Sequence, residues 1–431
     1  MKKEINIAVV GLGNIGSYFC NEIVKKKKDI FLKTGKYLNL LYVSAKNKNK
    51  KRPFKFKNRQ WINKPLNIAN NPRVDIVVEL IGGSDGLAKK IVITALKNKK
   101  HVITANKALI AKNGDYLSLL AEKNKVNLEF EASVGGGIPI LRTIKEGLAT
   151  NKINKVVGIL NGTCNYILSK MESSKDSFAN VLRKAQILGY AEPRDPRFDL
   201  NGYDTLAKVR ILSALVFNNK ISKNNCLMNG IENIELEDIK MADKLNFRIK
   251  LLGITEIINN QLFERVHPCL IKKDTYIANV NGVMNAVILE GKPVGQSLLQ
   301  GEGAGPGPTS SALMSDLLSI LRGNIKYPFG LPFKKRKKIN TYDKNQYLNS
   351  FYLRFDVKDK PGVLSSITKV FTKNKISIKN LIQKPDKKNK TASIVILTHE
   401  AREKNFNSLI FNLNNNKSVK KKSTFIRIEK V

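Results

Sequence analysis

A segment of twenty residues, "GYAEPRDPRFDLNGYDTLAK" at 189–208, combines four carboxylates with a closing lysine. Asp204 and Lys208 are four positions apart, so they would share one face of the helix predicted for "YDTLAKVRILSALVF". A lysine beside carboxylates normally stays protonated and could donate that proton to a substrate oxygen. Such a pair is more often a solvated surface pair worth roughly a few tenths of a kcal/mol. Taken alone, the segment therefore favours the surface pair.

A glycine motif near the start of the sequence predicts a dinucleotide site. "INIAVV" at 5–10 is typical of a buried strand, "GLGNIG" follows it directly, and "SYFCNEIVKKKK" has helical spacing. In this context Gly11 permits a tight turn, Gly13 lets a pyrophosphate approach, and Gly16 lets the helix pack on the strand. The amides at the helix N-terminus would face the phosphates.

The end of the second predicted strand bears on the choice of nucleotide. This strand, "LNLLYVSA" at 38–45, continues as "SAKNKNKKR" without any acid. An NAD-preferring site usually has Asp or Glu there to hold the ribose hydroxyls. Ser44 and Lys46 could instead accept a 2′-phosphate, so the sequence favours NADP.

Strands and helices then alternate along the chain. Strands are expected at 75–83 and 101–106, with helices at about 85–99 and 107–124. This alternation predicts a doubly wound parallel sheet. The stretch "TANK" ends one of these strands, which places Thr104, Asn106 and Lys107 at the carboxyl edge, where ligands bind.

Three loops supply backbone groups rather than reactive side chains. "EASVGGGIP" at 131–139 and "GEGAGPGPT" at 301–309 are too rich in glycine for strand interiors. The second loop would return to the cofactor, and a helix near 310–322 would complete the nucleotide domain. "ILNGTCNYI" at 159–167 predicts a strand end and a helix start, with Thr163 as N-cap. Its exposed amides could also hold a substrate carboxylate.

Composition limits the classes of protein to consider. The 431 residues, 42% of them hydrophobic, suffice for two or three domains. The chain has no long apolar run and no signal-like start, so we expect a soluble cytoplasmic protein without a membrane partner. Its four cysteines are far apart, which does not indicate a metal cluster or a disulfide framework. His267 is expected to be structural.

The net charge of +41 would by itself suggest a polyanion partner. The lysines are spread over many loops without interleaved aromatic residues, which favours a compositional bias of the surface. We therefore expect no specific nucleic-acid partner, with weak binding of polyanions at low salt.

The C-terminal part has its own pattern. "FYLRFDVKDKPGVLSSITKVFTKNKISIKNLIQ" and "TASIVILTHE" predict strands around an amphipathic helix, after the lysine-rich segment "PFKKRKKINTYDKNQY". This part resembles the ACT domain, a ferredoxin-like module that binds small amino acids. The turn "DKPGVL" at 359–364 carries the resemblance, and its free amides could take a carboxylate.

Six motifs in order extend the resemblance over about residues 5–330. They are "VVELIGG", "TANKALIAKNG", "EASVGGGIPI", "GILNGTCNYIL", "GYAE…DLNGYDTLAK" and "GEGAGPGPTSSALMSDL". In this order and spacing they resemble homoserine dehydrogenases. The resemblance implies reversible NAD(P)H-dependent reduction of L-aspartate 4-semialdehyde to L-homoserine, in threonine, methionine and isoleucine biosynthesis. It also implies feedback inhibition by threonine through the ACT domain, and a homodimer or homotetramer.

The resemblance assigns roles to individual residues. Lys208 corresponds to the catalytic lysine that exchanges a proton with the substrate oxygen. The implied substrate-binding residues are Glu192, Asp204, Asp199, Thr163 and Lys107. The implied cofactor contacts are Gly11, Gly13, Asn14, Ile15, Gly16, Thr104, Lys107, Gly189, Gly303 and Gly305. A monovalent cation such as sodium would be held by Glu131, Val134, Gly136 and Ile138.

The sequence departs from the family pattern beside Glu192. The family usually has Glu-x-Asp-Pro, whereas "EPRDP" contains one more residue, which makes Asp195 the nearest substitute for Glu192. Cys164 also stands where the family more commonly has threonine.

Two alternative functions stay open at this point. One is another Rossmann dehydrogenase with an ACT domain, such as a phosphoglycerate dehydrogenase, although "NGTCNY" disfavours it. The other is a polyanion-binding protein that uses the basic surface. An aspartokinase module is not expected, because the chain begins directly with the first predicted strand.

The predicted architecture is α/β. A Rossmann-type doubly wound parallel sheet at 1–130 is completed by about 305–330. An α+β domain for catalysis, substrate binding and dimerisation follows at 131–305. A linker at 331–348 then leads to the ferredoxin-like ACT regulatory domain at 349–431.

Overall fold

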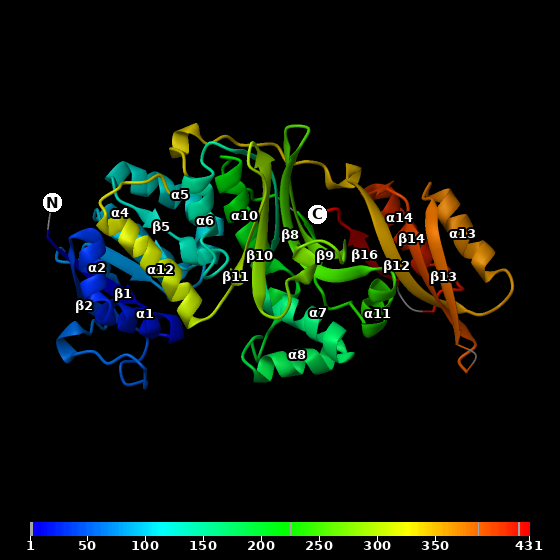
Figure 1. Ribbon diagram of the computed structural model, residues 1–431, viewed down its shortest axis with the longest axis horizontal. Helices are drawn as coiled ribbons and strands as arrows, with labels where there is room; N and C mark the ends of the chain where they lie inside the picture. The colour runs from blue at the N-terminus through cyan, green and yellow to red at the C-terminus, as the bar shows by residue number, and fades with distance from the viewer. Residues whose placement is uncertain (1–2, 225, 387, 421–422) are drawn as a thin grey trace.

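The computed structural model describes residues 3–224, 226–386, 388–420 and 423–431. The molecule is elongated, with a parallel sheet at the N-terminal end, a mixed sheet in the middle and a small α/β layer at the C-terminal end (Figure 1). None of the helices in these ranges is both long enough and apolar enough to cross a membrane.

The N-terminal sheet has the strand order β2-β1-β3-β4-β5, and all of its pairs are parallel. Its strands are β1 (Glu4–Val10), β2 (Tyr37–Ser44), β3 (Ile76–Glu79), β4 (His101–Thr104) and β5 (Leu128–Glu129). Its helices are α1 (Asn14–Lys25), α2 (Lys27–Thr34), α3 (Leu66–Asn70), α4 (Gly86–Lys97), α5 (Lys107–Asn124) and α12 (Pro306–Leu321).

Helices cover both faces of this sheet, which confirms the doubly wound prediction. Alternate residues of β1 divide between two cores, with Ala8 facing α3, α4 and α5, and Val9 facing α1, α2 and α12. The late helix α12 packs against α1, as expected for a helix that completes the nucleotide domain. Figure 1 shows it in yellow beside the blue N-terminal helices.

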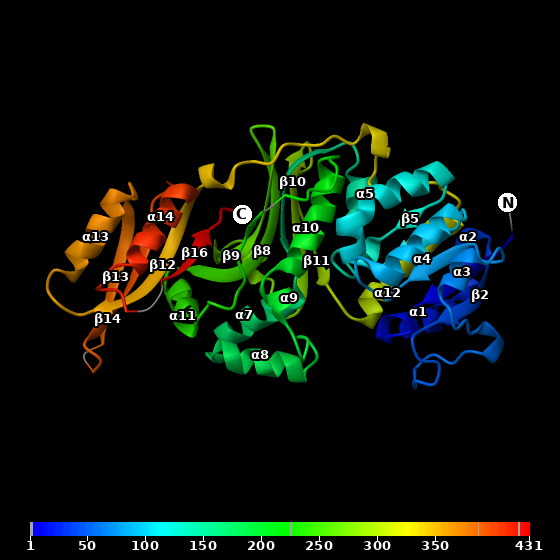
Figure 2. The same cartoon turned by 180° about the vertical axis from the view of Figure 1, so that it is seen from behind.

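The middle of the molecule is a mixed sheet with helices on one face, shown from behind in Figure 2. Its strands are β6 (Lys152–Ile159), β7 (Leu227–Met228), β8 (Phe247–Ile258), β9 (Gln261–Lys272), β10 (Met284–Lys292) and β11 (Gly295–Glu302). Its helices are α6 (Ile140–Arg142), α7 (Gly162–Ser174), α8 (Phe178–Ile187), α9 (Arg197–Leu200), α10 (Tyr203–Val216) and α11 (Leu236–Lys244).

The C-terminal layer runs βαββαβ, the order of a ferredoxin-like fold, with one additional two-residue strand before its second helix. Its elements are β12 (Leu348–Lys358), α13 (Val363–Lys373), β13 (Ile378–Asp386), β14 (Thr391–Thr398), β15 (Ala401–Arg402), α14 (Glu403–Asn414) and β16 (Thr424–Ile428). One face of its sheet packs on α13 and α14 through a core that includes Phe351, Phe371 and Phe406.

This layer is joined to the middle sheet by strand pairing. The final strand β16 pairs with β12 on one side and, in parallel, with β9 of the middle sheet on the other. The middle and C-terminal sheets are therefore continuous, in the order β11-β10-β6-β8-β9-β16-β12-β14-β13. The predicted linker is also held in place, because Lys220 N donates to Lys337 O and Leu262 N donates to Asn340 O. The domain boundaries given above remain predictions.

Candidate active site

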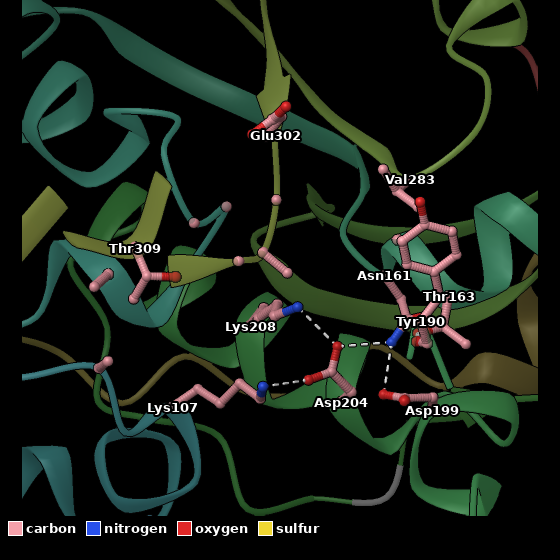
Figure 3. A pocket seen from close by; sticks show the side chains of 18 of the residues that line it. Lys107, Asn161, Thr163, Tyr190, Asp199, Asp204, Lys208, Val283, Glu302 and Thr309 are labelled. Carbon is pink, nitrogen blue, oxygen red and sulfur yellow. Dashed lines mark hydrogen bonds and ion pairs between the residues drawn. The ribbon is translucent and has the colours of Figure 1, made fainter. Parts of the chain in front are cut away.

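A cavity of about 620 Å³ lies where the nucleotide domain meets the middle sheet. The first turns of α1 and α5 contribute Ile15 and Lys107, and α10 contributes Asp204 and Lys208. Figure 3 shows Lys107, Asn161, Asp199, Asp204 and Lys208 converging on one side of the cavity. The structure therefore brings together residues that are about one hundred positions apart in the sequence.

Asp204 is the centre of an ion cluster. Its Oδ2 lies 2.7 Å from Lys208 Nζ, and its Oδ1 lies 2.8 Å from Lys107 Nζ. Asp204 is 3% exposed and Lys208 7% exposed. Lys208 Nζ also donates to Leu160 O at 2.5 Å. The predicted i, i+4 pair thus lies on α10, but it is buried at the cavity and is not a solvated surface pair.

Asn161 is a central residue that the sequence analysis did not single out. Its Nδ2 donates to Asp199 Oδ1 and to Asp204 Oδ2, both at 2.9 Å. Its Oδ1 accepts from Cys164 N and so caps α7. The prediction that Thr163 is this N-cap is therefore wrong, because the Thr163 hydroxyl donates to Tyr190 O instead. Asparagine is among the preferred N-cap residues, so its place before "GTC" was the available signal.

The proton affinities of the two lysines move in opposite directions. Burial lowers the pKa of Lys208, helped by the charge of Lys107 and only partly opposed by Asp204. For Lys107, burial is outweighed by the charge and hydrogen bond of Asp204, which raise its pKa. Lys208 is thus the cation that gives up its proton more easily, which the sequence-based expectation of a firmly protonated lysine did not anticipate.

The two aspartates are also distinguished. The pKa of Asp204 is lowered, because Lys208 and Lys107 outweigh the effect of burial. The pKa of Asp199 is raised by burial and by the charge of Asp204. Asp204 therefore stays ionised, while Asp199 is the more readily protonated acid of the pair.

Not all predicted substrate residues reach the cavity. Thr163 and Asp199 line it together with Lys107. The Glu192 side chain is exposed on the 189–197 turn and does not line the cavity. Asp195, its nearest substitute, is also exposed and pairs with Arg197. The substrate role of Glu192 therefore stays a prediction.

The glycine loop after β1 has the features expected for a pyrophosphate. Gly11 has φ +106°, and a Cβ there would lie 2.5 Å from Leu80 O. A Cβ on Gly16 would lie 1.9 Å from Gly11 O, whereas one on Gly13 would meet nothing within 4 Å. Helix α1, which begins at Asn14, has no side-chain cap, so its first amides are available to an anion.

The other predicted cofactor contacts divide into two groups. Gly189, Gly303 and Gly305 line the cavity, as does Ile15. Thr104 is fully buried, and its hydroxyl donates to Glu79 Oε2 at 2.7 Å. Its side chain therefore links the ends of β4 and β3 and does not line the cavity. Glu79 in turn accepts from the amides of Ile81 and Gly82, a role that sequence reasoning missed.

The environment of β2 changes the candidates for a 2′-phosphate. The Ser44 side chain is buried and donates to Ile62 O at 2.6 Å, so it is not presented to a ligand as expected. Arg52 instead lies next to the glycine loop, where its Nε donates to Leu12 O at 3.1 Å. Its guanidinium also holds the carbonyls of Lys48 and Lys50, which folds the basic loop toward the nucleotide site.

The predicted cation loop folds tightly against the cavity. Gly135 and Gly136 have positive φ, and a Cβ on Gly136 would lie 2.4 Å from Gly303 O. The Glu131 carboxylate accepts from Leu141 N and Arg142 N, so this side chain holds the loop. Of the four expected carbonyls, those of Glu131 and Ile138 each accept one backbone amide, which leaves a second lone pair for a cation.

Comparisons with known proteins agree with this geometry. Family models match at residues 11–131 ("Homoserine dehydrogenase, NAD binding domain"), 139–318 ("Homoserine dehydrogenase") and 351–410 ("ACT domain"). The chain is 38% identical to a homoserine dehydrogenase of Neisseria gonorrhoeae and 35% identical to one of Bacillus subtilis, with 99% of each chain covered. A solved homoserine dehydrogenase structure from Thiobacillus denitrificans aligns with TM-score 0.92 and 36% identity, covering 99% of this chain and 98% of that one.

Proposed function

The chain belongs to the homoserine dehydrogenase family, and from this we propose how its own residues carry out the reaction. It is an oxidoreductase that interconverts L-aspartate 4-semialdehyde and L-homoserine with a nicotinamide cofactor. The Lys107–Asp204–Lys208 cluster at the cavity between the two domains is the observation that supports the residue roles below.

Lys208 is the proton donor in the reductive direction. When bound, the nicotinamide supplies a hydride to the aldehyde carbon. Lys208 Nζ gives a proton to the oxygen that becomes the hydroxyl, and its lowered pKa eases that loss. In the oxidative direction the neutral amine takes the proton back. Asp204 holds the ammonium in place and stays ionised throughout.

The remaining polar groups hold the substrate. Homoserine is a zwitterion, so its α-ammonium needs a carboxylate, which Asp199 provides from the cavity wall. Its carboxylate is bound by Lys107 and by the backbone near Thr163 at the start of α7. Glu192 would join this set only if the 189–197 turn folds inward when substrate binds.

The reaction and the substrate site are tested together by kinetics with the purified protein. We expect NADPH consumption with aspartate 4-semialdehyde and NADP reduction with L-homoserine. Asp199→Asn should raise KM for L-homoserine about 10-fold, the scale of a charged hydrogen bond, with a smaller effect on kcat. Asp176→Asn, a partly exposed acid just before α8 that does not line the cavity, is the control. An unchanged KM in Asp199→Asn would remove this residue from the substrate site.

NADP is proposed as the preferred cofactor. The loop after β2 contains no acid, and Arg52 lies against the glycine loop. Arg52→Ala should lower kcat/KM for NADPH by about 10-fold or more and leave NADH little changed. Lys55→Ala, an exposed change in the following segment, is the control. Equal losses with both cofactors would mean that Arg52 only shapes the loop.

A monovalent cation such as sodium is proposed for the 131–138 loop, with the carbonyls of Glu131, Val134, Gly136 and Ile138 as ligands. The positive φ values and the contact with Gly303 place this turn next to the cavity wall. We expect thermal stability to rise with sodium chloride more than with tetramethylammonium chloride at equal ionic strength. Equal responses to both salts would argue against a cation here.

An amino-acid effector, threonine first among the candidates, is proposed to bind the ACT domain and inhibit the enzyme. The support is the ACT match at residues 351–410. Inhibition of initial rates by L-threonine, with L-serine as a comparison, tests this.

A further inference from the structure

A second cavity lies where the C-terminal layer meets the middle sheet. Its volume is about 470 Å³. The middle sheet contributes Phe247, Lys272 and Thr275, and the C-terminal layer contributes Ser350, Lys379, Leu397, Thr398, Ile428, Glu429, Lys430 and Val431. A molecule bound here would therefore contact both domains at once.

The cavity lies on the sheet face that the two helices of the C-terminal layer leave uncovered. Phe351 and Leu353 belong to the core under α13 and α14, whereas the neighbouring Tyr352 belongs to the core shared with the middle domain. Part of this second face packs on α11, where the Tyr352 hydroxyl donates to Asp238 Oδ1. Ser350, two residues before Tyr352 and so on the same face, opens onto the cavity instead.

The charges of the cavity favour an anion. Lys272 and Lys379 lie in its wall, and within the described part of the chain no carboxylate pairs with either of them. The Lys430 ammonium is turned to Glu400 at 2.8 Å. The Glu429 carboxylate is held by Arg265, with Nε to Oε1 and Nη2 to Oε2 both at 3.2 Å, so its charge is already balanced.

The other walls suit a short aliphatic body. Phe247, Leu397 and Ile428 supply apolar surface. The Thr398 side chain is fully buried and its hydroxyl accepts from Phe351 N, so Ser350 supplies the hydroxyl that can donate to a polar group of a ligand. A cationic rim with apolar walls and one hydroxyl donor matches a small amino acid held by its carboxylate.

The cavity borders the short contact that joins the two sheets. Strands β16 and β9 pair through only two steps, Arg427 with Cys269 and Ile428 with Leu270, and Ile428 lines the cavity. Arg427 also donates to Asn229 Oδ1 at 3.0 Å, and Asn229 N donates to Val266 O. A ligand against Ile428 therefore contacts the strand that holds this region together.

The same contacts continue to the active site. Ile231, two residues after Asn229, donates its N–H to Leu200 O at 3.0 Å. The backbone of Gly230 is so close that a Cβ there would lie 2.4 Å from Leu200 O. Leu200 follows Asp199, whose carboxylate accepts from Asn161 beside Asp204. Few contacts therefore separate the cavity from Asp199 and Asp204 at the active site.

We propose that this junction cavity is the effector site: it binds a small aliphatic or hydroxylated amino acid by its carboxylate, through Lys272 and Lys379. Binding there changes the β16–β9 contact and, through Asn229 and Leu200, the position of Asp199. This rests on the proposal above that the enzyme has an amino-acid effector. It places the site at the domain junction and not at the "DKPGVL" turn.

The test is isothermal titration of the full-length protein with L-threonine, L-isoleucine and L-methionine, together with initial rates in their presence. Lys379→Glu and Lys272→Glu should each raise the Kd of the bound amino acid about 10-fold or more, with basal activity unchanged. Lys404→Glu on α14, an exposed lysine outside the cavity, is the matched control. Ser350→Phe, which fills the cavity without a change of charge, should abolish binding.

Each other outcome has a definite meaning. Wild-type affinity in all three cavity variants would overturn the proposal. A fourth variant, Lys360→Glu, changes the "DKPGVL" turn, and a loss of binding in this variant alone would move the site to that turn. A wild type that binds an amino acid without any change in rate would overturn the effector role. A wild type that binds none of them but reduces aspartate 4-semialdehyde would refute the effector while leaving the dehydrogenase function intact.

Discussion

Two clusters of buried charges in this molecule use similar residues for different ends. At the active site, Lys107 and Lys208 share Asp204 beside a large cavity. At the domain junction, Arg265 is 0% exposed and pairs with Glu429 and Glu256, and its guanidinium lies 4.7 Å from the Tyr347 ring centroid.

The two clusters differ in which protons they hold. At the junction, Glu429 and its neighbours outweigh the burial of Arg265 and raise its pKa, while the charge of Arg265 outweighs burial and lowers that of Glu429. Both groups are therefore fixed in their charged forms. At the active site, Lys208 has a lowered pKa beside a second cation, so one proton is left easier to remove. The comparison indicates that a lysine whose pKa is lowered marks the catalytic cluster, whereas charges that stabilise one another mark the structural one.

Removing Lys208 is the strongest test of this comparison. Lys208→Ala should lower kcat by about 10²- to 10⁴-fold, the scale for loss of a general acid. Its free energy of unfolding should fall only modestly, because Asp204 keeps Lys107 and Asn161 as partners. Steady-state rates and urea unfolding measure the two effects, with the exposed Lys240→Ala on α11 as control. If the variant keeps its rate, the proton donor is Lys107 or a water molecule and not Lys208.

The junction cluster should give the opposite result. Arg265→Leu leaves Glu429 and Glu256 without their buried cation, so the free energy of unfolding should fall by about 3–5 kcal/mol. The folded fraction should keep most of its kcat. Arg265→Leu combined with Glu429→Leu should recover part of the loss, because the unpaired carboxylate is also removed. If the double variant is less stable than the single one, the Glu429 side chain stabilises the fold through contacts other than its ion pair with Arg265.

The sequence predicted the catalytic cluster better than the junction for a physical reason. Asp204 and Lys208 are four residues apart on one helix, and helix geometry alone places them together. The glycine motif likewise determines a local turn, and both predictions agree with the structure. Asn161 was missed although it precedes a helix, because its bonds to Asp199 and Asp204 depend on the packing of α7 against the 199–204 turn.

The continuous sheet could not be read from a local pattern. "TFIRI" at 424–428 predicts a strand as well as many other segments do, but its partner β9 is about 160 residues away. Strand pairing between distant segments depends on the whole fold and not on the strand's own residues. The exposed position of Glu192 could not be predicted either, because this residue lies on a turn whose geometry is not helical.

A pH titration sharpens the comparison from the structural side. The pKa of Glu429 falls from its ordinary 4.5 to about 2 in the folded protein, because Arg265 outweighs the effect of burial. The unfolded chain therefore binds more protons between these values, so this stabilisation is present above pH 4.5 and is lost as the pH falls toward 2. The difference in unfolding free energy between wild type and Glu429→Gln should be constant from pH 7 to 5 and shrink by pH 3. A constant difference down to pH 3 would mean that Glu429 is not held ionised by its partners.

The smallest expected effect separates the two tasks of Asn161. Asn161→Ser keeps an N-cap acceptor for Cys164 N but removes the amide that donates to both aspartates. Asn161→Ala removes both functions and should lose about 1 kcal/mol more unfolding free energy than the serine variant. If Asn161 orients the carboxylates for substrate, the two variants should share one raised KM for L-homoserine despite their different stabilities. If KM instead rises more in the less stable alanine variant, the N-cap bond of Asn161 determines substrate binding. Asn161 would then have a structural role, like the buried ion pairs of the junction, and would not orient the carboxylates.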